Sequence, residues 1–284
     1  MIVYFNGQFK ELDEVKISPF DRGFLYADGV YEVMRTYYGK LFRYPDHLQR
    51  FRESLNAIKI NYSGIDDLEN NIYKLFELNK FSNPNLSVYI QVTRGVSFPR
   101  KHSFPTIAVP PTIFISASPI KDKTRSIDEG IKAILEEDNR WSRCNIKSIS
   151  LLPAVLANQH AVEEGAEEAI LIRDGRLMEG SHTNFWGIKN EELWTAPLSN
   201  LILPGITRTV IMEICKSTGI KIIQEAIKKN DINNFDEFFI SGTTTEIKPV
   251  TRIDESIIGS GEPGKITRKI YNAYLKYVES KLWF

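Results

Sequence analysis

Alternating hydrophobic and polar positions near the N-terminus predict two β-hairpins. Residues Ile2 to Phe9 surround Asn6-Gly7, a dipeptide that favours the tight turn of a two-residue hairpin. Residues Val30 to Leu41 are rich in β-branched and aromatic side chains and turn at Tyr38-Gly39-Lys40. Two further β-rich runs in this half predict single strands, Leu86 to Thr93 and Thr112 to Ser118.

Hydrophobic residues spaced three and four positions apart predict helices between these strands. One such set follows Pro45 and comprises Leu48, Phe51, Leu55 and Ile58. A second set comprises Leu68, Ile72, Leu75 and Phe76. Because this spacing places the hydrophobic side chains on one helix face, each set predicts an amphipathic helix.

The second half of the chain mixes strands and helices. Its hydrophobic runs predict a strand, a strand meander and a buried strand at Ile131 to Leu135, Ala169 to Trp194 and Glu237 to Ser241. Its helical stretches are Leu151 to Glu164, Ile206 to Ser217 and Ile266 to Leu282. The mixture favours the α+β class.

Two polar stretches divide these elements. Gly95 to Pro111 contains four prolines and the basic cluster Arg100-Lys101-His102, so it predicts a long loop. Long loops in compact domains are often functional. Pro119 to Asp128 is polar and charged, and predicts a boundary between a domain over residues 1–119 and a domain over residues 120–284.

Composition narrows the class of protein. The 284 residues carry 36 basic and 36 acidic side chains, so nothing in the charge balance favours a nucleic-acid partner. No run approaches the ~18 apolar residues of a membrane span, and the start of the chain lacks the features of a signal peptide. The two cysteines are too few for a disulfide framework, so we expect a cytoplasmic protein.

Neither the glycine-rich stretch near the C-terminus nor the spacing of the histidines indicates a ligand site. Gly259 to Gly264 fits the dinucleotide pattern G-x-G-x-x-G, but Pro263 stands where a helix should begin and no βαβ unit surrounds it. A surface turn is the better interpretation. The four histidines do not have the spacing of zinc ligands, so we expect no metal.

Lys147 is a candidate for covalent chemistry. It lies just before a predicted helix, among residues that otherwise resemble a buried strand. Burial lowers the pKa of a lysine, and the neutral amine is the form that attacks a carbonyl to make a Schiff base. Most lysines are solvated surface groups, so position alone carries little weight.

Three further segments suggest an anionic cofactor. Glu179-Gly180 could offer a carboxylate to the nitrogen of a pyridine ring, or could be a solvated strand end. Leu203 to Thr207 could be a plain helix cap or an anion site built from free N–H groups. Gly242 to Glu246 could be a plain turn or a second wall around a phosphate.

Together these segments resemble the fold-type IV pyridoxal-phosphate (PLP) enzymes, and within them the D-amino-acid transaminases. The resemblance covers nearly the whole chain, and the order and spacing of its motifs are highly specific. The motifs are Asp21-Arg22-Gly23, Asp28 to Val33, His47 to Arg50, Gln91 to Gly95, Arg143 to Ser148, Glu179-Gly180-Ser181 with Asn184, Gly205-Ile206-Thr207, and Thr243-Thr244 with Glu246-Ile247. It implies a two-domain α+β fold of this type, with the PLP lysine in the C-terminal domain.

The resemblance also implies roles for individual residues. Lys147 would hold the cofactor as an internal aldimine and shuttle the proton, and Glu179 would pair with the pyridine nitrogen. Arg140 would lie near the ring hydroxyl. The phosphate would be held by Arg50, Ile206, Thr207 and Thr243. The substrate, through its α-carboxylate above all, would be received by Tyr31, Arg100, His102 and Thr244.

The activity implied is ping-pong transamination. A D-amino acid such as D-alanine, D-glutamate or D-aspartate would give its amino group to PLP, and a 2-oxo acid such as 2-oxoglutarate or pyruvate would accept it. The family is homodimeric, with its site between the domains and near the partner. We therefore expect the loop that carries Arg100 to reach the partner's site.

The L-branched-chain aminotransferases of the same fold are the main alternative. They carry a tyrosine five residues after the lysine, where this chain has Leu152. In contrast, Leu203-Pro204-Gly205 and Ser241-Gly242-Thr243 resemble the branched-chain pattern, and His182-Thr183 replaces small serines of the D-specific enzymes. Aminodeoxychorismate lyase is disfavoured by Glu32-Val33, and a non-catalytic PLP-binding relative would not need both Lys147 and Glu179.

Overall fold

The computed structural model describes residues 1–120 and 127–282 and divides the chain into two compact units. The first unit comprises Met1–Ile120 and Ile146–Ser150, and the second comprises Lys121–Asn145 and Leu151–Phe284. The predicted boundary at residues 119 and 120 lies next to this division. Residues 121–126 of the polar stretch that suggested the boundary lie outside the described residues.

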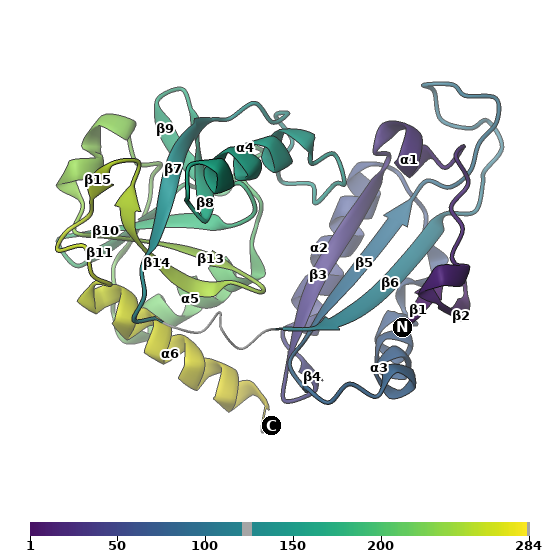
Figure 1. The fold of residues 1–284 in the computed structure, drawn as a ribbon, viewed down its shortest axis with the longest axis horizontal. Helices are drawn as coiled ribbons and strands as arrows, with labels where there is room; N and C mark the ends of the chain where they lie inside the picture. Colours follow the sequence, from purple (N-terminus) through teal and green to yellow (C-terminus); the bar gives the residue numbers. More distant parts are fainter. Residues whose placement is uncertain (121–126, 283–284) are drawn as a thin grey trace. The chain divides into compact units, whose positions relative to one another are not determined.

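The first unit is built on a six-stranded sheet (Figure 1). Its strands are β1 (Ile2–Phe5), β2 (Gln8–Glu11), β3 (Gly29–Tyr37), β4 (Lys40–Leu41), β5 (Leu86–Thr93) and β6 (Thr112–Pro119), in the order β2-β1-β6-β5-β3-β4. Asn6 and Gly7 have φ of 47° and 87°, as a two-residue hairpin turn requires. Both predicted hairpins and both predicted single strands are confirmed.

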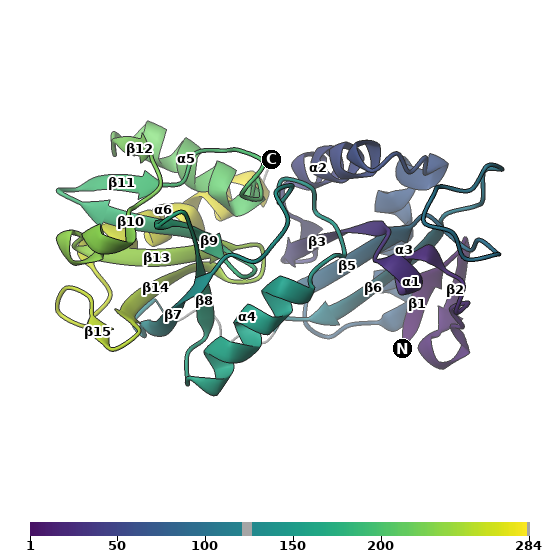
Figure 2. The same ribbon diagram turned by 90° about the horizontal axis from the view of Figure 1, so that it is seen from above.

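Helices cover one face of this sheet. They are α2 (Tyr44–Ala57) and α3 (Leu68–Asn79), and α2 runs along β3 (Figure 2). Phe51, Leu75 and Ile90 are fully buried in the core that the helices and strands share, as the helical spacing predicts. A five-residue helix, α1 (Arg22–Tyr26), precedes β3 and was not predicted.

The second unit is built on a nine-stranded mixed sheet. Its strands are β7 (Ile131–Glu137), β8 (Glu168–Arg173), β9 (Arg176–Gly180), β10 (Asn184–Lys189), β11 (Glu192–Thr195), β12 (Ile222–Gln224), β13 (Glu237–Gly242), β14 (Glu246–Ile253) and β15 (Ser256–Ile257). The order is β12-β11-β10-β13-β14-β7-β8-β9, with β15 paired to β14. The predicted strands are all present, whereas β12, β14 and β15 were not predicted.

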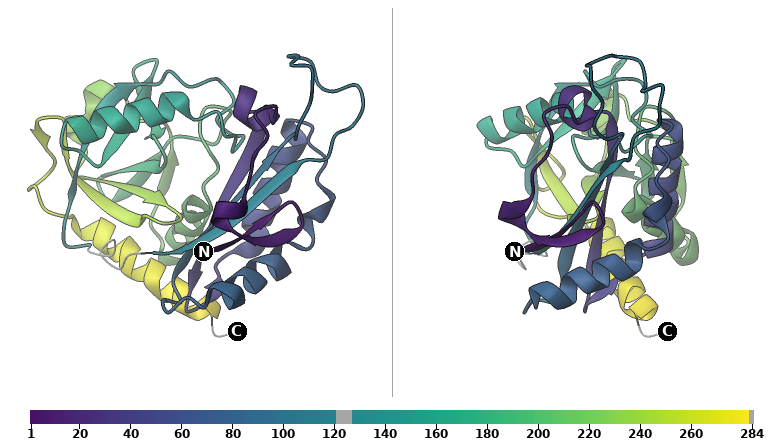
Figure 3. Two further views of the ribbon diagram at one scale, coloured as in Figure 1. Left: turned by 45° about the vertical axis from the view of Figure 1, so that its right-hand side comes forward. Right: turned by 90° about the vertical axis from the view of Figure 1, so that its right-hand side faces the viewer.

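Three helices pack on the second sheet. They are α4 (Leu152–Glu163), α5 (Ile206–Thr218) and α6 (Lys265–Leu282), close to the predicted ranges. Within this unit α4 and α6 lie on opposite sides of the strands (Figure 3). Short 3-10 helices complete the two units at Leu12–Glu14, Ser63–Ile65 and Lys229–Asn234. No helix within residues 1–120 and 127–282 is long and apolar enough to cross a membrane.

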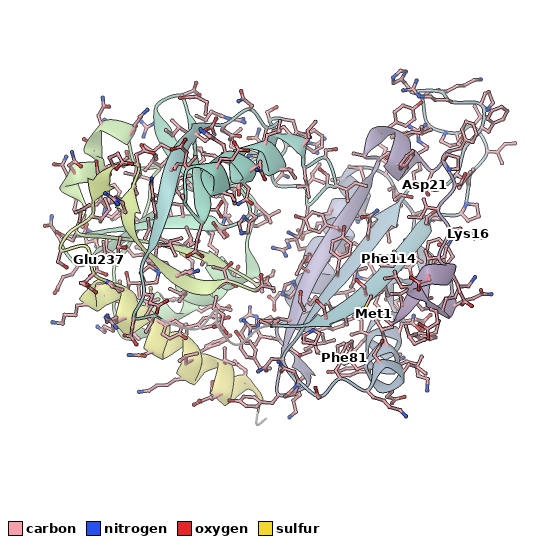
Figure 4. All side chains as sticks on the ribbon, viewed as in Figure 1. Met1, Lys16, Asp21, Phe81, Phe114 and Glu237 are labelled. Atoms are coloured by element: carbon pink, nitrogen blue, oxygen red, sulfur yellow. The ribbon has the colours of Figure 1, made fainter. Side chains whose placement is uncertain are left out.

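The stretch from Gly259 to Gly264 is a turn, as predicted. The helix α6 that follows it begins with occupied N–H groups. Glu237, labelled in Figure 4, accepts hydrogen bonds from the backbone N–H of Ile266 (2.9 Å) and of Thr267 (2.7 Å). A nucleotide phosphate would need these groups, so the rejection of a dinucleotide site has a structural reason.

The segment Ile146–Ser150 belongs to the first unit because its backbone pairs with β3. The N–H of Tyr31 donates to the carbonyl of Lys147 (3.0 Å), and the N–H of Ile149 donates to the carbonyl of Gly29 (3.1 Å). We predicted this lysine in the domain over residues 120–284, and the compact units differ from that expectation at this segment. Sequence position could not reveal a pairing over more than 100 residues.

Candidate active site

Lys147 lies over an aromatic ring in the first unit. Its Nζ is 4.2 Å from the centroid of the Tyr31 ring, and the side chain is half-buried. Its backbone N–H donates to Oγ of Ser54 on α2 (3.2 Å). With the bond from the N–H of Tyr31 to its carbonyl, the backbone of Lys147 is therefore held on both sides.

A buried ion pair lies on the neighbouring positions of β3 and α2. Glu32 accepts from Nε (3.0 Å) and Nη2 (2.5 Å) of Arg50, and its Oε1 lies 3.0 Å from Nδ1 of His47. Burial acts to raise the pKa of Glu32, but the charge of Arg50 and the contact with His47 hold it well below its usual range. Burial lowers the pKa of His47, so this imidazole favours the neutral form.

Arg50 was predicted as a phosphate ligand, and the structure gives it a defined orientation. Glu32 fixes one edge of its planar guanidinium, and a rigid fork that is held at one edge has a set direction for its other donors. Glu32 was not among the predicted site residues. Its role depends on a partner 18 positions away, which no local pattern reports.

Glu179 is a buried carboxylate of the second unit that accepts hydrogen bonds from three separate segments. It stands near the end of β9 and is 3% exposed. It accepts from Nη1 of Arg140 (2.6 Å), from Nδ2 of Asn184 (3.1 Å) and from the N–H of Leu203. Burial raises the pKa of Glu179 to about 7 despite these donors. An additional cation beside it would therefore favour the ionised form.

Arg140 is shared between two carboxylates. Besides its bond to Glu179, it donates from Nε (2.8 Å) and Nη2 (3.0 Å) to Asp138, which also pairs with Arg173 (3.1 Å). We predicted Arg140 near the ring hydroxyl of a cofactor, a role that stays a prediction. The structure adds a direct contact with Glu179 that sequence did not indicate.

Asn184 connects three predicted segments of this unit. Its Nδ2 donates to both Glu179 and the carbonyl of Leu203 (3.0 Å), and its backbone pairs with Ser241, next to the Gly242 turn. A Cβ placed on Gly205 would lie 2.0 Å from Asn184 Oδ1. Only glycine allows the backbone to pass this close, so the start of α5 is held against the carboxylate.

The predicted phosphate ligands of the second unit occupy a helix start and a turn. Gly205 caps α5 without a side-chain hydrogen bond, and Ile206 and Thr207 are buried in its first turn. The N–H groups of such a turn point along the helix axis and favour an anion. Thr243 and Thr244 are half-buried in the turn between β13 and β14.

Arg100 and His102 lie on the predicted long loop of the first unit, and both are exposed. The structure groups them with Tyr26 of α1, whereas Lys147 is grouped with Tyr31. The guanidinium carbon of Arg100 is 4.6 Å from the centroid of the Tyr26 ring, and the centroid of the His102 ring is 5.4 Å from it.

His182 contacts a buried carboxylate that sequence did not single out. Its Nδ1 lies 3.0 Å from Oγ of Ser181 and 3.2 Å from Oε2 of Glu168. Glu168 is fully buried and also accepts from the hydroxyl of Thr183 (2.7 Å). The imidazole is thus held at the tip of the turn that follows Glu179.

Comparisons with known proteins identify the family of this chain. Residues 29–253 match the family model described as amino-transferase class IV, which spans most of the chain. The chain belongs to the class IV aminotransferases. As a class IV aminotransferase it is a PLP-dependent enzyme of fold type IV, which confirms the predicted family, fold class and cofactor.

Relatives in sequence are D-alanine aminotransferases. The chain is 39% identical to a D-alanine aminotransferase of Staphylococcus haemolyticus over 280 residues, covering 98% of each chain. It is 39% identical to a D-alanine aminotransferase of Bacillus licheniformis over 274 residues, covering 96% of this chain and 95% of the other.

Solved structures of branched-chain aminotransferases share the fold. The enzyme of Thermoproteus uzoniensis with norvaline matches with a TM-score of 0.86 and 27% identity, covering 99% of this chain and 95% of the other. That of Escherichia coli matches with a TM-score of 0.87 and 25% identity, covering 96% and 92%. The sequence relatives are thus more similar to this chain than these structural ones.

Proposed function

We propose that this class IV aminotransferase transfers the amino group of a D-amino acid to a 2-oxo acid. The observation that carries the proposal is the 39% identity to D-alanine aminotransferases over 98% of both chains. D-alanine, D-glutamate or D-aspartate would be the donor, and 2-oxoglutarate or pyruvate the acceptor. Donor and acceptor use one site in turn, which gives ping-pong kinetics.

The residues present fit PLP. Glu179 is a buried carboxylate with a pKa of about 7, which a protonated pyridine nitrogen would bring fully into its ionised form. The start of α5, held close by the glycine at 205, offers N–H groups to a phosphate. Arg50 and Thr243 would add a guanidinium and a hydroxyl, and Arg140 would act near the ring hydroxyl.

Each residue then has a defined task. When bound, PLP supplies an electron sink for the substrate Cα. Glu179 would keep a proton on the ring nitrogen, and Lys147 would hold the cofactor covalently through Nζ. When free, Lys147 would act as base and then as acid toward the substrate Cα through Nζ, which lies 4.2 Å from the centroid of the Tyr31 ring.

Substrate recognition is assigned to a separate set of side chains. Arg100 offers a planar fork that suits a carboxylate, and His102 adds a donor two residues later. Tyr31 and Thr244 would complete the substrate contacts. Fixing the α-carboxylate fixes the face of Cα that meets the lysine, so this set would determine stereochemistry.

The L-branched-chain reaction is the alternative, because solved structures that share the fold are branched-chain aminotransferases. At 27% identity the Thermoproteus uzoniensis enzyme supports it less than the curated relatives support the D-specific reaction. An absorbance titration of the PLP-loaded protein separates the two. We expect D-alanine to remove the cofactor band and 2-oxoglutarate to restore it, and we expect no response to L-leucine. Loss of the band with L-leucine alone would reverse the assignment.

We also propose that the enzyme is a homodimer. The helix α4 exposes apolar side chains, with Leu152 67%, Leu156 61% and Val162 59% accessible in the single chain. Contiguous apolar surface on a water-facing helix is typical of an interface. Light scattering on the purified protein should give twice the mass of 32.6 kDa, and a monomer would exclude this arrangement.

The cytoplasm is the compartment that we propose. Cys144 and Cys215 are both free and buried. Free thiols in place of disulfides are usual where the medium is reducing. Fractionation of cells that produce the protein would test this, and recovery from an oxidising compartment would contradict it.

A further inference from the structure

A buried arginine of the first unit binds the backbone of the loop that carries Arg100 and His102. This loop joins β5 to β6 and projects past the end of the sheet beside α1 (Figure 1). Arg22, the first residue of α1, has a side chain that is 5% exposed. It donates from Nη1 to the carbonyls of Lys101 (2.7 Å) and Ser103 (3.2 Å), and from Nη2 to that of His102 (3.2 Å).

These three carbonyls belong to consecutive residues, directly after Arg100. A guanidinium is rigid and planar, so its two terminal nitrogens impose one curvature on the backbone that they bind. A lysine ammonium, with one donor centre on a flexible stem, could not do the same. Arg22 therefore sets the path of the backbone from which the side chains of Arg100 and His102 project.

The opposite edge of Arg22 is fixed by a carboxylate. Its Nε donates to Oδ2 of Asp28 (2.8 Å), which also accepts from Nε of Arg94 (2.8 Å). The guanidinium of Arg94 in turn lies 3.6 Å from the ring centroid of Phe104, on the same loop. The two arginines therefore share one countercharge, and both reach the loop from its base.

The short helix α1 also supplies the surface against which the loop side chains rest. Asp21, labelled in Figure 4, caps α1 by accepting from the N–H of Gly23 (2.8 Å). The ring of Tyr26 lies 4.8 Å from the guanidinium carbon of Arg22 and 4.6 Å from that of Arg100. Arg22, which binds the loop backbone, and Tyr26, against which the loop side chains rest, thus belong to the same short helix.

We propose that Arg22 is a positioning residue for recognition of the substrate α-carboxylate, acting through the loop that presents Arg100 and His102. This inference rests on the proposed function, since it needs those two residues to bind the carboxylate. Arg22 itself is turned toward carbonyls and Asp28, so it would not touch the substrate. Its removal should weaken binding of the substrate while the covalent chemistry at Lys147 stays intact.

A double-mutant cycle on the PLP-loaded enzyme tests this. With D-alanine as donor, Arg22→Gln should raise KM roughly 10- to 100-fold, since a misplacement of about 1 Å can have an effect of this size. Its kcat should change far less. In an Arg100→Gln background the same substitution should have little further effect on KM, because the group through which it acts is gone.

A matched control separates positioning from loss of stability. Ile72→Val removes one methyl group from the buried core of the same unit, far along the chain from the loop. It should lower the thermal midpoint without raising KM. Arg22→Lys keeps the charge beside Asp28 and should restore stability while KM stays high.

Hydrogen exchange gives a readout that does not depend on activity. In Arg22→Gln the amides of the loop peptide over residues 95–111 should exchange faster than in wild type, whereas those of α3 should not. An unchanged exchange rate in the loop would overturn the proposal that Arg22 holds its backbone in place.

The kinetics of wild type, Arg100→Gln and Arg22→Gln distinguish failure of the positioning role from failure of the proposed function. If wild type does not react with D-amino acids, or if Arg100→Gln leaves KM for D-alanine unchanged, the proposed function fails. If wild type reacts, Arg100→Gln is impaired, and Arg22→Gln matches wild type in KM, then only the positioning role is overturned. Equal effects of Arg22→Gln in both backgrounds would also overturn it.

Discussion

Two buried carboxylates, one in each unit, behave in opposite ways. Glu32 is 0% exposed and Glu179 is 3% exposed, and each is bonded to an arginine. Yet the pKa of Glu32 lies well below its usual range, whereas that of Glu179 is raised to about 7. Burial alone therefore does not determine the charge of either group.

The difference lies in how each arginine divides its donors. Arg50 gives two of them to Glu32. Arg140 gives two to Asp138 and one to Glu179, and the charge of Asp138 further raises the pKa of Glu179. The negative charge of Glu32 is thus compensated by Arg50, whereas the charge of an ionised Glu179 would be compensated only in part by Arg140. A pyridinium is a cation that could compensate the rest.

The comparison is meaningful only if the covalent chemistry lies elsewhere, at Lys147. Lys147→Ala should reduce transamination by at least about 10⁴-fold, because both the covalent link and the proton transfer depend on its amine. The fold and both carboxylates should be unaffected. Steady-state rates with D-alanine and a circular dichroism spectrum check this, and retained turnover would contradict the assignment.

Replacing each carboxylate by its neutral isostere should separate their roles. Glu179→Gln should lower kcat by roughly 10²- to 10³-fold, the usual loss for a preorganised charge at a reacting centre. Glu192→Gln, on strand β11 of the same sheet, is the control and should match wild type. If Glu32→Gln reduced kcat more than Glu179→Gln, the comparison would have to be reversed.

Stability should respond in the opposite order. Glu32→Gln leaves the Arg50 guanidinium buried without its countercharge, so the free energy of unfolding should fall by about 3–5 kcal/mol. Chemical denaturation measures this. Glu53→Gln removes an exposed carboxylate from α2, the helix that carries Arg50. It should change stability by less than about 0.5 kcal/mol. A loss as small as that in Glu32→Gln would show that the buried pair is dispensable.

The contribution of Glu179 should make the cofactor-free protein less stable as the pH rises toward neutrality. The native pKa of Glu179, about 7, lies above its ordinary 4.5, so the native state binds the proton more tightly than the unfolded chain. The free energy of unfolding should therefore fall between about pH 4.5 and 7, by roughly 3 kcal/mol. Glu32 has the opposite sign, and its contribution should be lost only in strong acid. The difference in thermal midpoint between wild type and Glu179→Gln across pH tests this slope, because His47 and the other titrating groups are common to both proteins.

The smallest expected effect is that of replacing Asp138, which competes with Glu179 for the donors of Arg140. Asp138→Asn should release Arg140 toward Glu179 and lower the pKa of that carboxyl, because a nearby negative charge is removed. The pH midpoint of the stability change in the cofactor-free protein should shift downward accordingly. An upward shift would mean that Asp138 supports the charge of Glu179 instead of competing for it.

Local elements of the fold could be predicted from the sequence, and elements with distant causes could not. The hairpin at Asn6-Gly7 and the helix containing Phe51 and Leu55 depend on neighbours within a few residues. The strand β14 has Pro249 opposite Phe239 of β13, and a proline argues against a central strand. The helix α1 has a single turn, too short for a periodic pattern.

The candidate site shows the same division. Lys147 and Glu179 could be proposed from the sequence because each lies in a local motif. The contacts that set their surroundings join residues that are remote in sequence, such as Arg140 with Glu179 over 39 positions. The loop residues Arg100 and His102 could be identified from their pattern, but the carbonyls that Arg22 binds leave no trace in the sequence.

The segment Ile146–Ser150 has a consequence for how the protein is made. During synthesis the chain leaves the ribosome from its N-terminus, and residues 1–120 emerge well before this segment. Until it follows, the N–H of Tyr31 lacks the carbonyl of Lys147 and the edge of β3 stays open. The first unit can therefore mature only after part of the second has been translated. A gene fragment ending at residue 120 would encode neither a complete unit nor the amine of Lys147.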